Sequence, residues 1–90
     1  MIAEVSFFGR VQGVFFRDYT RRFALPLGIT GWVMNMPDGS VRAVFEGERR
    51  DIEELIRKLR HEHPAAQVDD VSISWSEGDR RHDDFRVRHQ

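Results

Sequence analysis

The chain has 90 residues, of which 40% are hydrophobic and 32% are charged, and its formal net charge is −1. This length predicts one domain, residues 1–90, and the charge balance lacks the basic excess of a general nucleic-acid binder. The sequence has no cysteine and no apolar run close to the ~20 residues of a membrane span. We therefore expect no disulfide, no thiolate metal site, no nucleic-acid or membrane partner, and a cytoplasmic location.

The first predicted elements are a strand and a helix joined by a glycine-containing turn. The strand is the apolar run Ile2–Phe8. After the turn, apolar residues recur at i, i+3, i+7, i+8 and i+11, which is one face of a helix, and they are Phe16, Tyr19, Phe23, Ala24 and Leu27. Pro26 lacks an N–H and crowds the preceding turn, so we expect this helix to close or kink around Ala24–Leu25.

The second half of the chain repeats this alternation of strands and helices. The predicted elements are a strand Ile29–Asn35, a hairpin turn Met36–Gly39, a strand Val41–Glu46, a helix Arg50–Glu62, a strand Val68–Trp75 and a short strand Phe85–Arg88. The order βαββαβ plus a terminal strand is typical of the α+β, ferredoxin-like split βαβ fold. We expect an antiparallel sheet with two helices packed on one face.

The segment Gly9–Arg17 predicts an anion-binding site. Glycines allow a tight turn in which successive N–H groups point into one concavity. The start of a helix adds unpaired N–H groups and a partial positive charge. Arg17 adds a planar fork of donors that fits two oxygens of a phosphate or carboxylate.

Two segments of the sequence resemble the double signature of the acylphosphatase family. The first is Gly9-Arg10-Val11-Gln12-Gly13-Val14-Phe15-Phe16-Arg17, and the second is Leu27-Gly28-Ile29-Thr30-Gly31-Trp32-Val33-Met34-Asn35-Met36-Pro37-Asp38-Gly39-Ser40-Val41. The similarity continues through Phe45-Glu46-Gly47 and Phe85-Arg86-Val87-Arg88. The resemblance implies a ferredoxin-like enzyme that hydrolyses the carboxyl–phosphate bond of acyl phosphates without a metal or an organic cofactor.

The resemblance also assigns roles to particular residues. It implies that Arg17 and Asn35 are the catalytic residues, with Asn35 holding the attacking water. It implies that phosphate is bound by the loop before the first helix, through Gln12, Gly13, Val14, Phe15, Phe16 and Arg17. The expected partner is a small-molecule acyl phosphate, and the expected state is a monomer.

Several features depart from the family pattern or need a separate interpretation. Asp18 directly follows Arg17, where it can pair with the arginine or weaken the positive potential, and Glu62–Ala66 is only a loose match to the family's loop. His61 and His63 lie two residues apart, which on a helix places them on different faces, so we expect no metal site. The charged run Glu46–Glu54 is interpreted as a solvated helix start.

The aromatic residues are predicted to be mostly core residues. This prediction covers Phe7, Phe8, Phe15, Phe16, Phe23 and Trp32. For Phe15 there is an alternative, because its place beside the predicted cradle also allows it to flank the acyl group of a substrate.

Three other functions remain possible for this pattern. RNA-recognition domains share the element order, but the third strand, Ser40–Phe45, has one aromatic and lacks their signature. Acylphosphatase-like modules also begin larger hydrogenase-maturation proteins, although the absence of sequence after the last strand favours a free-standing enzyme. A regulatory module that binds small anions without turnover is the third alternative.

Overall fold

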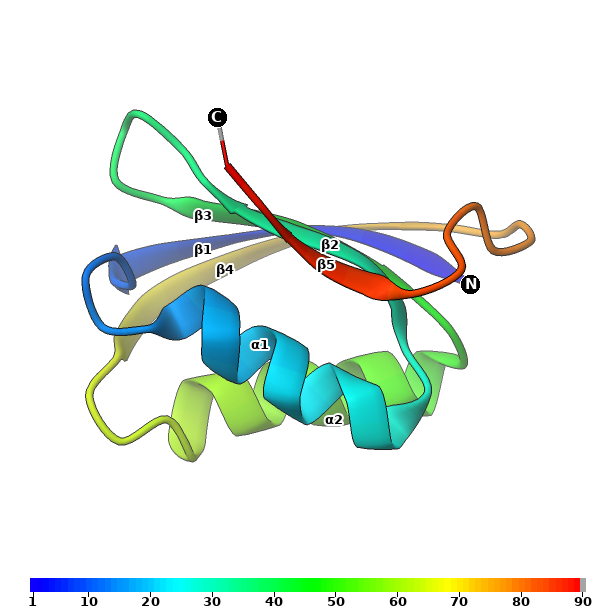
Figure 1. Cartoon of the computed structure of the whole chain (residues 1–90), viewed down its shortest axis with the longest axis horizontal. Coiled ribbons are helices and arrows are strands. Elements are labelled where there is room, and N and C mark those ends of the chain that lie inside the picture. The colour runs from blue at the N-terminus through cyan, green and yellow to red at the C-terminus, as the bar shows by residue number, and fades with distance from the viewer. Residues whose placement is uncertain (90) are drawn as a thin grey trace.

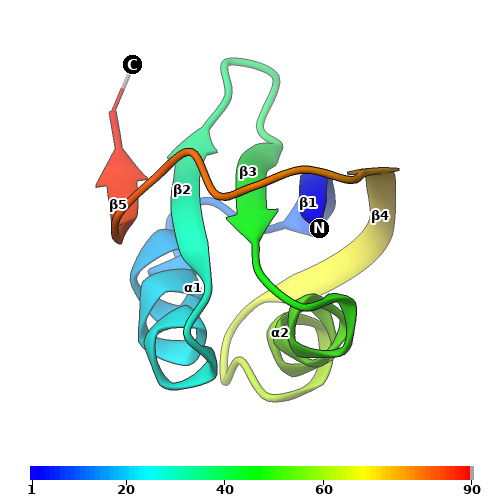
Figure 2. The same cartoon turned by 90° about the vertical axis from the view of Figure 1, so that its right-hand side faces the viewer.

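Five strands form one sheet and two helices cover one of its faces (Figures 1 and 2) in the computed structural model, which describes residues 1–89. In chain order the elements are β1 (Ile2–Arg10), α1 (Phe16–Ala24), a 3₁₀ turn (Leu25–Leu27), β2 (Thr30–Asn35), β3 (Val41–Glu46), α2 (Arg49–His61), β4 (Gln67–Ser76) and β5 (Phe85–Arg88). This is the predicted α+β ferredoxin-like order with its additional strand, so the predicted fold class is confirmed. Within residues 1–89, no helix is long and apolar enough to cross a membrane.

The strand order in the sheet is β4-β1-β3-β2-β5. All neighbouring pairs are antiparallel except β2 and β5, which run parallel with Gly31 opposite Phe85. The predicted antiparallel sheet is thus confirmed for three of the four pairs and is wrong for the pair of β2 and β5, which makes the sheet mixed. The reason is topological: β5 reverses direction after β4, and β4 itself runs against β2, so β5 runs with β2.

The core lies between the sheet and the two helices. Alternate residues of β1 and β3, such as Val5, Phe7 and Phe45, are buried against an apolar face of α2 that contains Ile52, Leu55, Ile56 and Leu59. This alternation is the two-residue period of a half-covered strand. The hydrophobic pattern thus fixes which face of each element meets the core.

The aromatic predictions were right only in part. Phe7 and Phe16 are buried and Phe23 packs against the core, but Phe8 is 38% exposed and Phe15 is 75% exposed. Phe8 follows the inward-facing Phe7 on a strand and so points to the opposite face. Trp32 is only half-buried, and the guanidinium of Arg88 lies 4.8 Å from its ring centroid.

Helix α1 ends at Ala24, which agrees with the end predicted from Pro26. The N–H of Leu25 donates to the carbonyl of Arg21, and Leu25–Leu27 continue as a 3₁₀ turn with Pro26 in its first positions. Gly28 then caps this turn at φ 67°, in the left-handed region that glycine adopts without strain. The turn returns the chain to the sheet at the start of β2.

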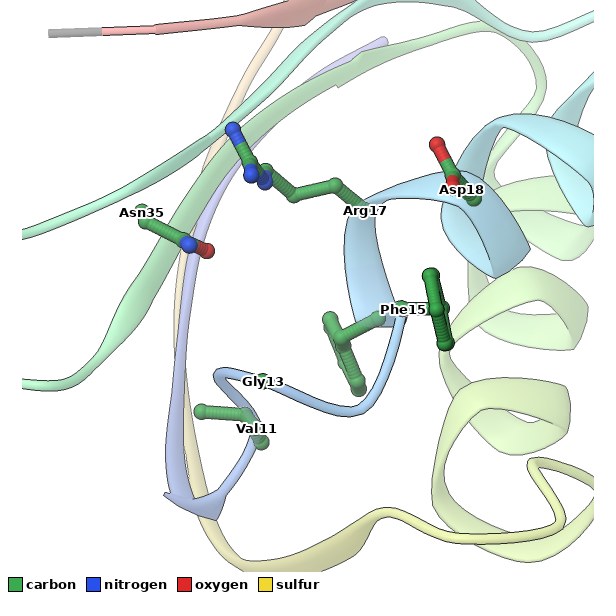
Figure 3. Close-up of a pocket in the computed structure, with 7 residues that line it drawn as sticks. Val11, Gly13, Phe15, Arg17, Asp18 and Asn35 are labelled. Carbon is green, nitrogen blue, oxygen red and sulfur yellow. The ribbon is translucent and has the colours of Figure 1, made fainter.

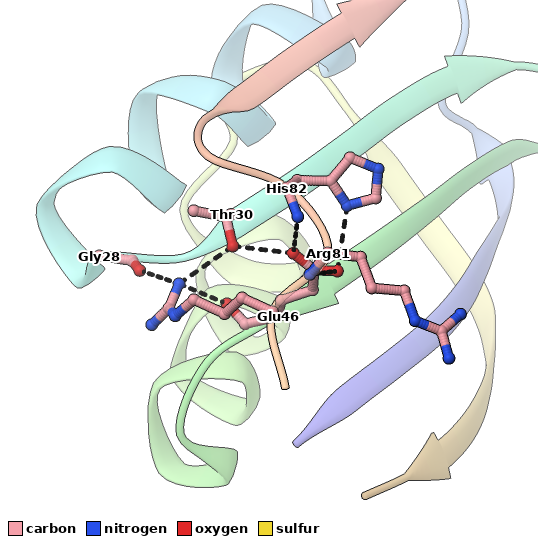
Figure 4. Close-up of polar contacts among 6 residues, drawn as sticks. Gly28, Thr30, Glu46, Arg81 and His82 are labelled. Carbon is pink, nitrogen blue, oxygen red and sulfur yellow. Dashed lines mark hydrogen bonds and ion pairs between the residues drawn. The ribbon is translucent and has the colours of Figure 1, made fainter. Parts of the chain in front are cut away.

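Glu46 is fully buried at the end of β3, so its assignment to a solvated helix start was wrong. Figure 4 shows its carboxylate holding the segment between β4 and β5: it accepts from the hydroxyl of Thr30 (2.9 Å) and from the main-chain N–H groups of Arg81 (3.0 Å) and His82 (3.1 Å). Nδ1 of His82 lies 3.0 Å from Oε2. Burial acts to raise the pKa of Glu46, but these hydrogen bonds outweigh it and hold the pKa below its ordinary value.

Candidate active site

A pocket of about 270 Å³ lies where the β1–α1 loop, the first turn of α1 and the end of β2 come together. Figure 3 shows the side chains of Arg17 and Asn35 extending toward one another from α1 and β2, across the space beside Gly13. The residues that line the pocket are Val11, Gly13, Phe15, Phe16, Arg17, Asp18 and Asn35. The fold therefore joins the two predicted catalytic residues and much of the predicted loop in one place.

The loop reaches the helix through two left-handed residues. Gly13 has φ 75°, and Phe15, the residue before α1, has φ 59° and ψ 29°. Phe15 is the only non-glycine residue with a positive φ within residues 1–89, and such a conformation costs about 1–3 kcal/mol for a residue with a side chain. A loop held in this shape directs main-chain N–H groups into a common concavity.

The start of α1 adds donors to the same pocket. The N–H groups of Phe16, Arg17 and Asp18 have no partner within the helix, whereas the N–H of Tyr19 donates to the carbonyl of Phe15 at 3.1 Å. No side chain caps this helix start. The first turn of α1 thus offers unpaired donors and the positive end of a helix dipole to an anion.

Arg17 is held in place by the end of β5. Its Nη1 donates to the carbonyl of Arg88 at 3.2 Å and lies 3.1 Å from Nδ1 of His89. Both contacts use Nη1, so Nε and Nη2 are the donors that can meet an anion in the pocket. The arginine is therefore positioned by the C-terminal segment rather than by Asp18, and sequence spacing gave no signal for these partners.

Asn35 is the last residue of β2, directly before the hairpin to β3. Its Oδ1 is buried and has no hydrogen-bond partner within the described residues. A buried acceptor without a partner is rare in native structures and calls for an explanation. Facing a pocket that contains Arg17, this oxygen can accept a hydrogen bond from a bound water or substrate.

Gln12 and Val14 do not line the pocket. The side-chain amide of Gln12 donates to the carbonyls of Met36 and Ser40, each at 2.8 Å, and so ties the loop to the β2–β3 hairpin. Val14 is buried. The Gln12 amide is thus engaged by the hairpin, which leaves Arg17 as the side-chain donor among the six predicted phosphate-binding residues. The phosphate contacts of all six stay predictions.

The site combines main-chain donors, a helix start and a guanidinium with one unpaired amide oxygen. This arrangement favours a small ligand with several anionic oxygens, beside which a neutral group can be oriented. The fold and the pocket thus define a small α+β protein with a candidate anion-binding site beside the first turn of α1.

The chain belongs to the acylphosphatase family, whose profile matches residues 3–87. It is 48% identical to an acylphosphatase of Pelotomaculum thermopropionicum over 75 residues, which cover 83% of this chain and 82% of that protein. It is also 49% identical to an acylphosphatase of Salinibacter ruber over 81 residues, covering 89% and 84% of the two chains. The protein is therefore an enzyme that hydrolyses acyl phosphates.

Solved structures support the same assignment. The crystal structure of acylphosphatase from Bacillus subtilis superposes with a TM-score of 0.91 at 29% identity, covering 98% of this chain and 99% of that one. An acylphosphatase from Coxiella burnetii gives a TM-score of 0.87 at 40% identity, covering 97% and 90%. Full-length HypF in its phosphate- and nucleotide-bound form gives 0.86 at 30% identity, with 97% of this chain matching 11% of that protein.

Proposed function

We propose that hydrolysis takes place in the pocket between the β1–α1 loop and the end of β2. Arg17 and the main-chain N–H groups of residues 12–16 bind the phosphoryl group, and Asn35 holds the attacking water. The observation that carries the proposal is the buried, unpaired Oδ1 of Asn35 in a pocket that also contains Arg17.

The chemistry needs few catalytic groups. Water attacks phosphorus, the bond between phosphorus and the acyl oxygen breaks, and the products are a carboxylate and inorganic phosphate. A carboxylate leaving group has a pKa of about 4, so it departs without a proton from a general acid. What remains is to position the water and to stabilise charge on the phosphoryl oxygens in a loose transition state.

The two tasks fall to different parts of the site. In this proposal Arg17 and the loop N–H groups donate to the phosphoryl oxygens, and the presence of Gly13, Phe15, Phe16 and Arg17 in the pocket lining supports it. Asn35 is not a base, so its carbonyl oxygen accepts one hydrogen of the water and fixes its direction of attack. The proton released by the water goes to a phosphoryl oxygen of the substrate.

The test separates turnover from anion binding. The purified chain is incubated with an aryl acyl phosphate in EDTA, and binding of inorganic phosphate is titrated in parallel. We expect Asn35→Ala to lower kcat by about 10²–10³ while leaving phosphate affinity largely unchanged. Gln67→Ala, which removes an exposed amide on β4, is the matched control and should leave both quantities unchanged.

Two results would contradict the proposal. A parallel fall in kcat and phosphate affinity in Asn35→Ala would make Asn35 a ligand of the anion instead of the water holder. A folded wild-type protein that binds phosphate but shows no turnover in EDTA would contradict the proposed hydrolysis by protein groups alone.

A further inference from the structure

His63 is a buried imidazole in the connection between α2 and β4. Its side chain is stacked on Phe16, with ring centroids 5.8 Å apart and planes at 17°, and its centroid lies 4.3 Å from that of Tyr19. Only 8% of the residue is exposed. In Figure 1 this connection and the β1–α1 loop lie at the same end of the molecule. The stacking on Phe16 places His63 against the first turn of α1.

The hydrogen bonds of the ring define its tautomer. Nδ1 accepts from the main-chain N–H groups of Ala65 (3.0 Å) and Ala66 (2.9 Å), so it carries no proton. A neutral imidazole has one N–H, which here must be on Nε2. His63 therefore presents a fixed donor on the side opposite the Ala65–Ala66 turn.

That donor has no partner among the described residues. Nε2 is buried and makes no hydrogen bond. The ring is stacked on Phe16, which directly follows Val14 and Phe15 in the chain, so it lies beside the peptide groups of these two residues. Burial lowers the pKa of His63, and the main-chain carbonyls of Val14 and Phe15 are among the groups that oppose this effect. Both carbonyls belong to the loop that precedes α1.

The geometry of the peptide bond connects these carbonyls to the pocket. In a trans peptide the C=O and N–H groups point in opposite directions. The carbonyl of Val14 shares its peptide plane with the N–H of Phe15, and the carbonyl of Phe15 shares its plane with the N–H of Phe16. The Phe15 carbonyl already accepts from the N–H of Tyr19 at 3.1 Å, so α1 fixes the orientation of that peptide. A donor bound to the Val14 carbonyl would direct the N–H of Phe15 to the opposite side of the loop.

We propose that His63 is a positioning residue for the phosphate loop, and that its Nε2–H donates to the carbonyl of Val14 when an anion occupies the pocket. The bond fixes the peptide plane whose N–H meets the anion. It also polarises that peptide, which strengthens the N–H as a donor. The inference rests on the proposed function, because it takes residues 12–16 to be the phosphate site.

Two substitutions test the roles of the two ring nitrogens of His63 separately. His63→Asn keeps an acceptor near the position of Nδ1 and removes the Nε2 donor. His63→Gln places an amide N–H near the position of Nε2 and gives up the acceptor. His61→Asn, at the exposed end of α2, is the matched control.

The measurements are inorganic phosphate affinity by calorimetry, KM and kcat for an aryl acyl phosphate, and thermal unfolding. We expect His63→Asn to bind phosphate about fivefold more weakly, the equivalent of one lost hydrogen bond, with a matching rise in KM. Because the ring is buried against Phe16 and Tyr19, this variant should also melt at a lower temperature than the wild type. His63→Gln should recover most of the phosphate affinity while melting at a lower temperature. His61→Asn should match the wild type.

Other outcomes overturn the proposal. Wild-type affinity in His63→Asn would leave His63 as a cap of the Ala65–Ala66 turn, while phosphate binding by the wild type would keep the proposed function intact. Equal losses of affinity and stability in both variants would reduce His63 to a packing residue. A folded wild type that binds no phosphate would overturn both this inference and the proposed function.

Discussion

Nη1 of Arg17 donates to the main-chain carbonyl of Arg88 at 3.2 Å, although 71 residues separate the two in the sequence. Nδ1 of His89 lies 3.1 Å from the same nitrogen. Because Arg17 lines the pocket, these contacts make the end of β5 part of the support of the site. The parallel pairing of β5 with β2 is what brings residues 88 and 89 to this position.

His89→Ala tests this support. The substitution removes one of the two contacts that orient Arg17, so we expect KM for an acyl phosphate to rise by about two- to fivefold with the fold intact. Steady-state kinetics measure the effect, and His61→Ala is the control for loss of an exposed histidine. Unchanged kinetics would mean that the Arg88 carbonyl alone suffices.

Arg17→Lys tests the planar fork. A lysine keeps the positive charge but is a point donor and cannot offer two parallel N–H groups while also donating to Arg88. We expect kcat/KM to fall nearly as far as in Arg17→Ala, by about 10²-fold or more. Near-normal turnover in Arg17→Lys would exclude a two-oxygen contact.

Glu46→Gln tests the anchor at the opposite end of the sheet. The amide replaces one acceptor oxygen by a donor that faces the donors of Arg81, His82 or Thr30. We expect the free energy of unfolding to fall by about 2–3 kcal/mol near neutral pH, measured by urea denaturation. Glu48→Gln, an exposed carboxylate next to α2, should change it far less.

The difference in unfolding free energy between the wild type and Glu46→Gln should depend on pH. The native pKa of Glu46 lies below its ordinary value of 4.5, so the unfolded chain takes up the proton first as the pH falls. The stabilisation by the carboxylate is therefore complete above pH 4.5 and is lost as the pH falls through the native pKa. The difference in stability between wild type and Glu46→Gln should narrow as the pH falls below 4.5; a difference that widened over that range would contradict this assignment.

Phe15→Gly and Phe15→Ala together measure the strain before α1. Both variants remove the exposed ring, but only glycine adopts φ 59° without strain. We expect the glycine variant to be more stable than the alanine variant by about 0.5–1 kcal/mol, after allowing for the greater freedom of glycine in the unfolded chain. Equal stability in urea unfolding would show that the loop relaxes when the ring is removed.

The elements were predictable because their signals are local. The bounds of β3 and β5 agree with the predicted Val41–Glu46 and Phe85–Arg88, and α2 is displaced by one residue from the predicted Arg50–Glu62. Hydrophobic alternation in the strands and helical spacing in the helices indicate which face of each element meets the core. Pro26 indicates where α1 ends. The direction of β5 was missed, because it depends on where the crossover from β4 returns to the sheet.

The site was predictable as a set of residues, but its supports were not. Gly13, Phe15, Phe16, Arg17 and Asn35 lie around one pocket, whereas their roles stay predictions. The supports of the site and fold depend on contacts between residues far apart in sequence. Gln12 bonds to the β2–β3 hairpin, Arg17 bonds to Arg88, and Glu46 is buried. No local pattern marks such contacts, because they arise only when the sheet assembles.

The wide separation of Arg17 and Arg88 has a consequence for the newly made protein. A ribosome adds about 5–20 residues per second, so Arg17 and its loop emerge several seconds before β5 is made. During that interval the nascent chain carries the arginine without the carbonyl that orients it. Catalytic competence should therefore appear late in synthesis, when β5 has left the exit tunnel and joined β2.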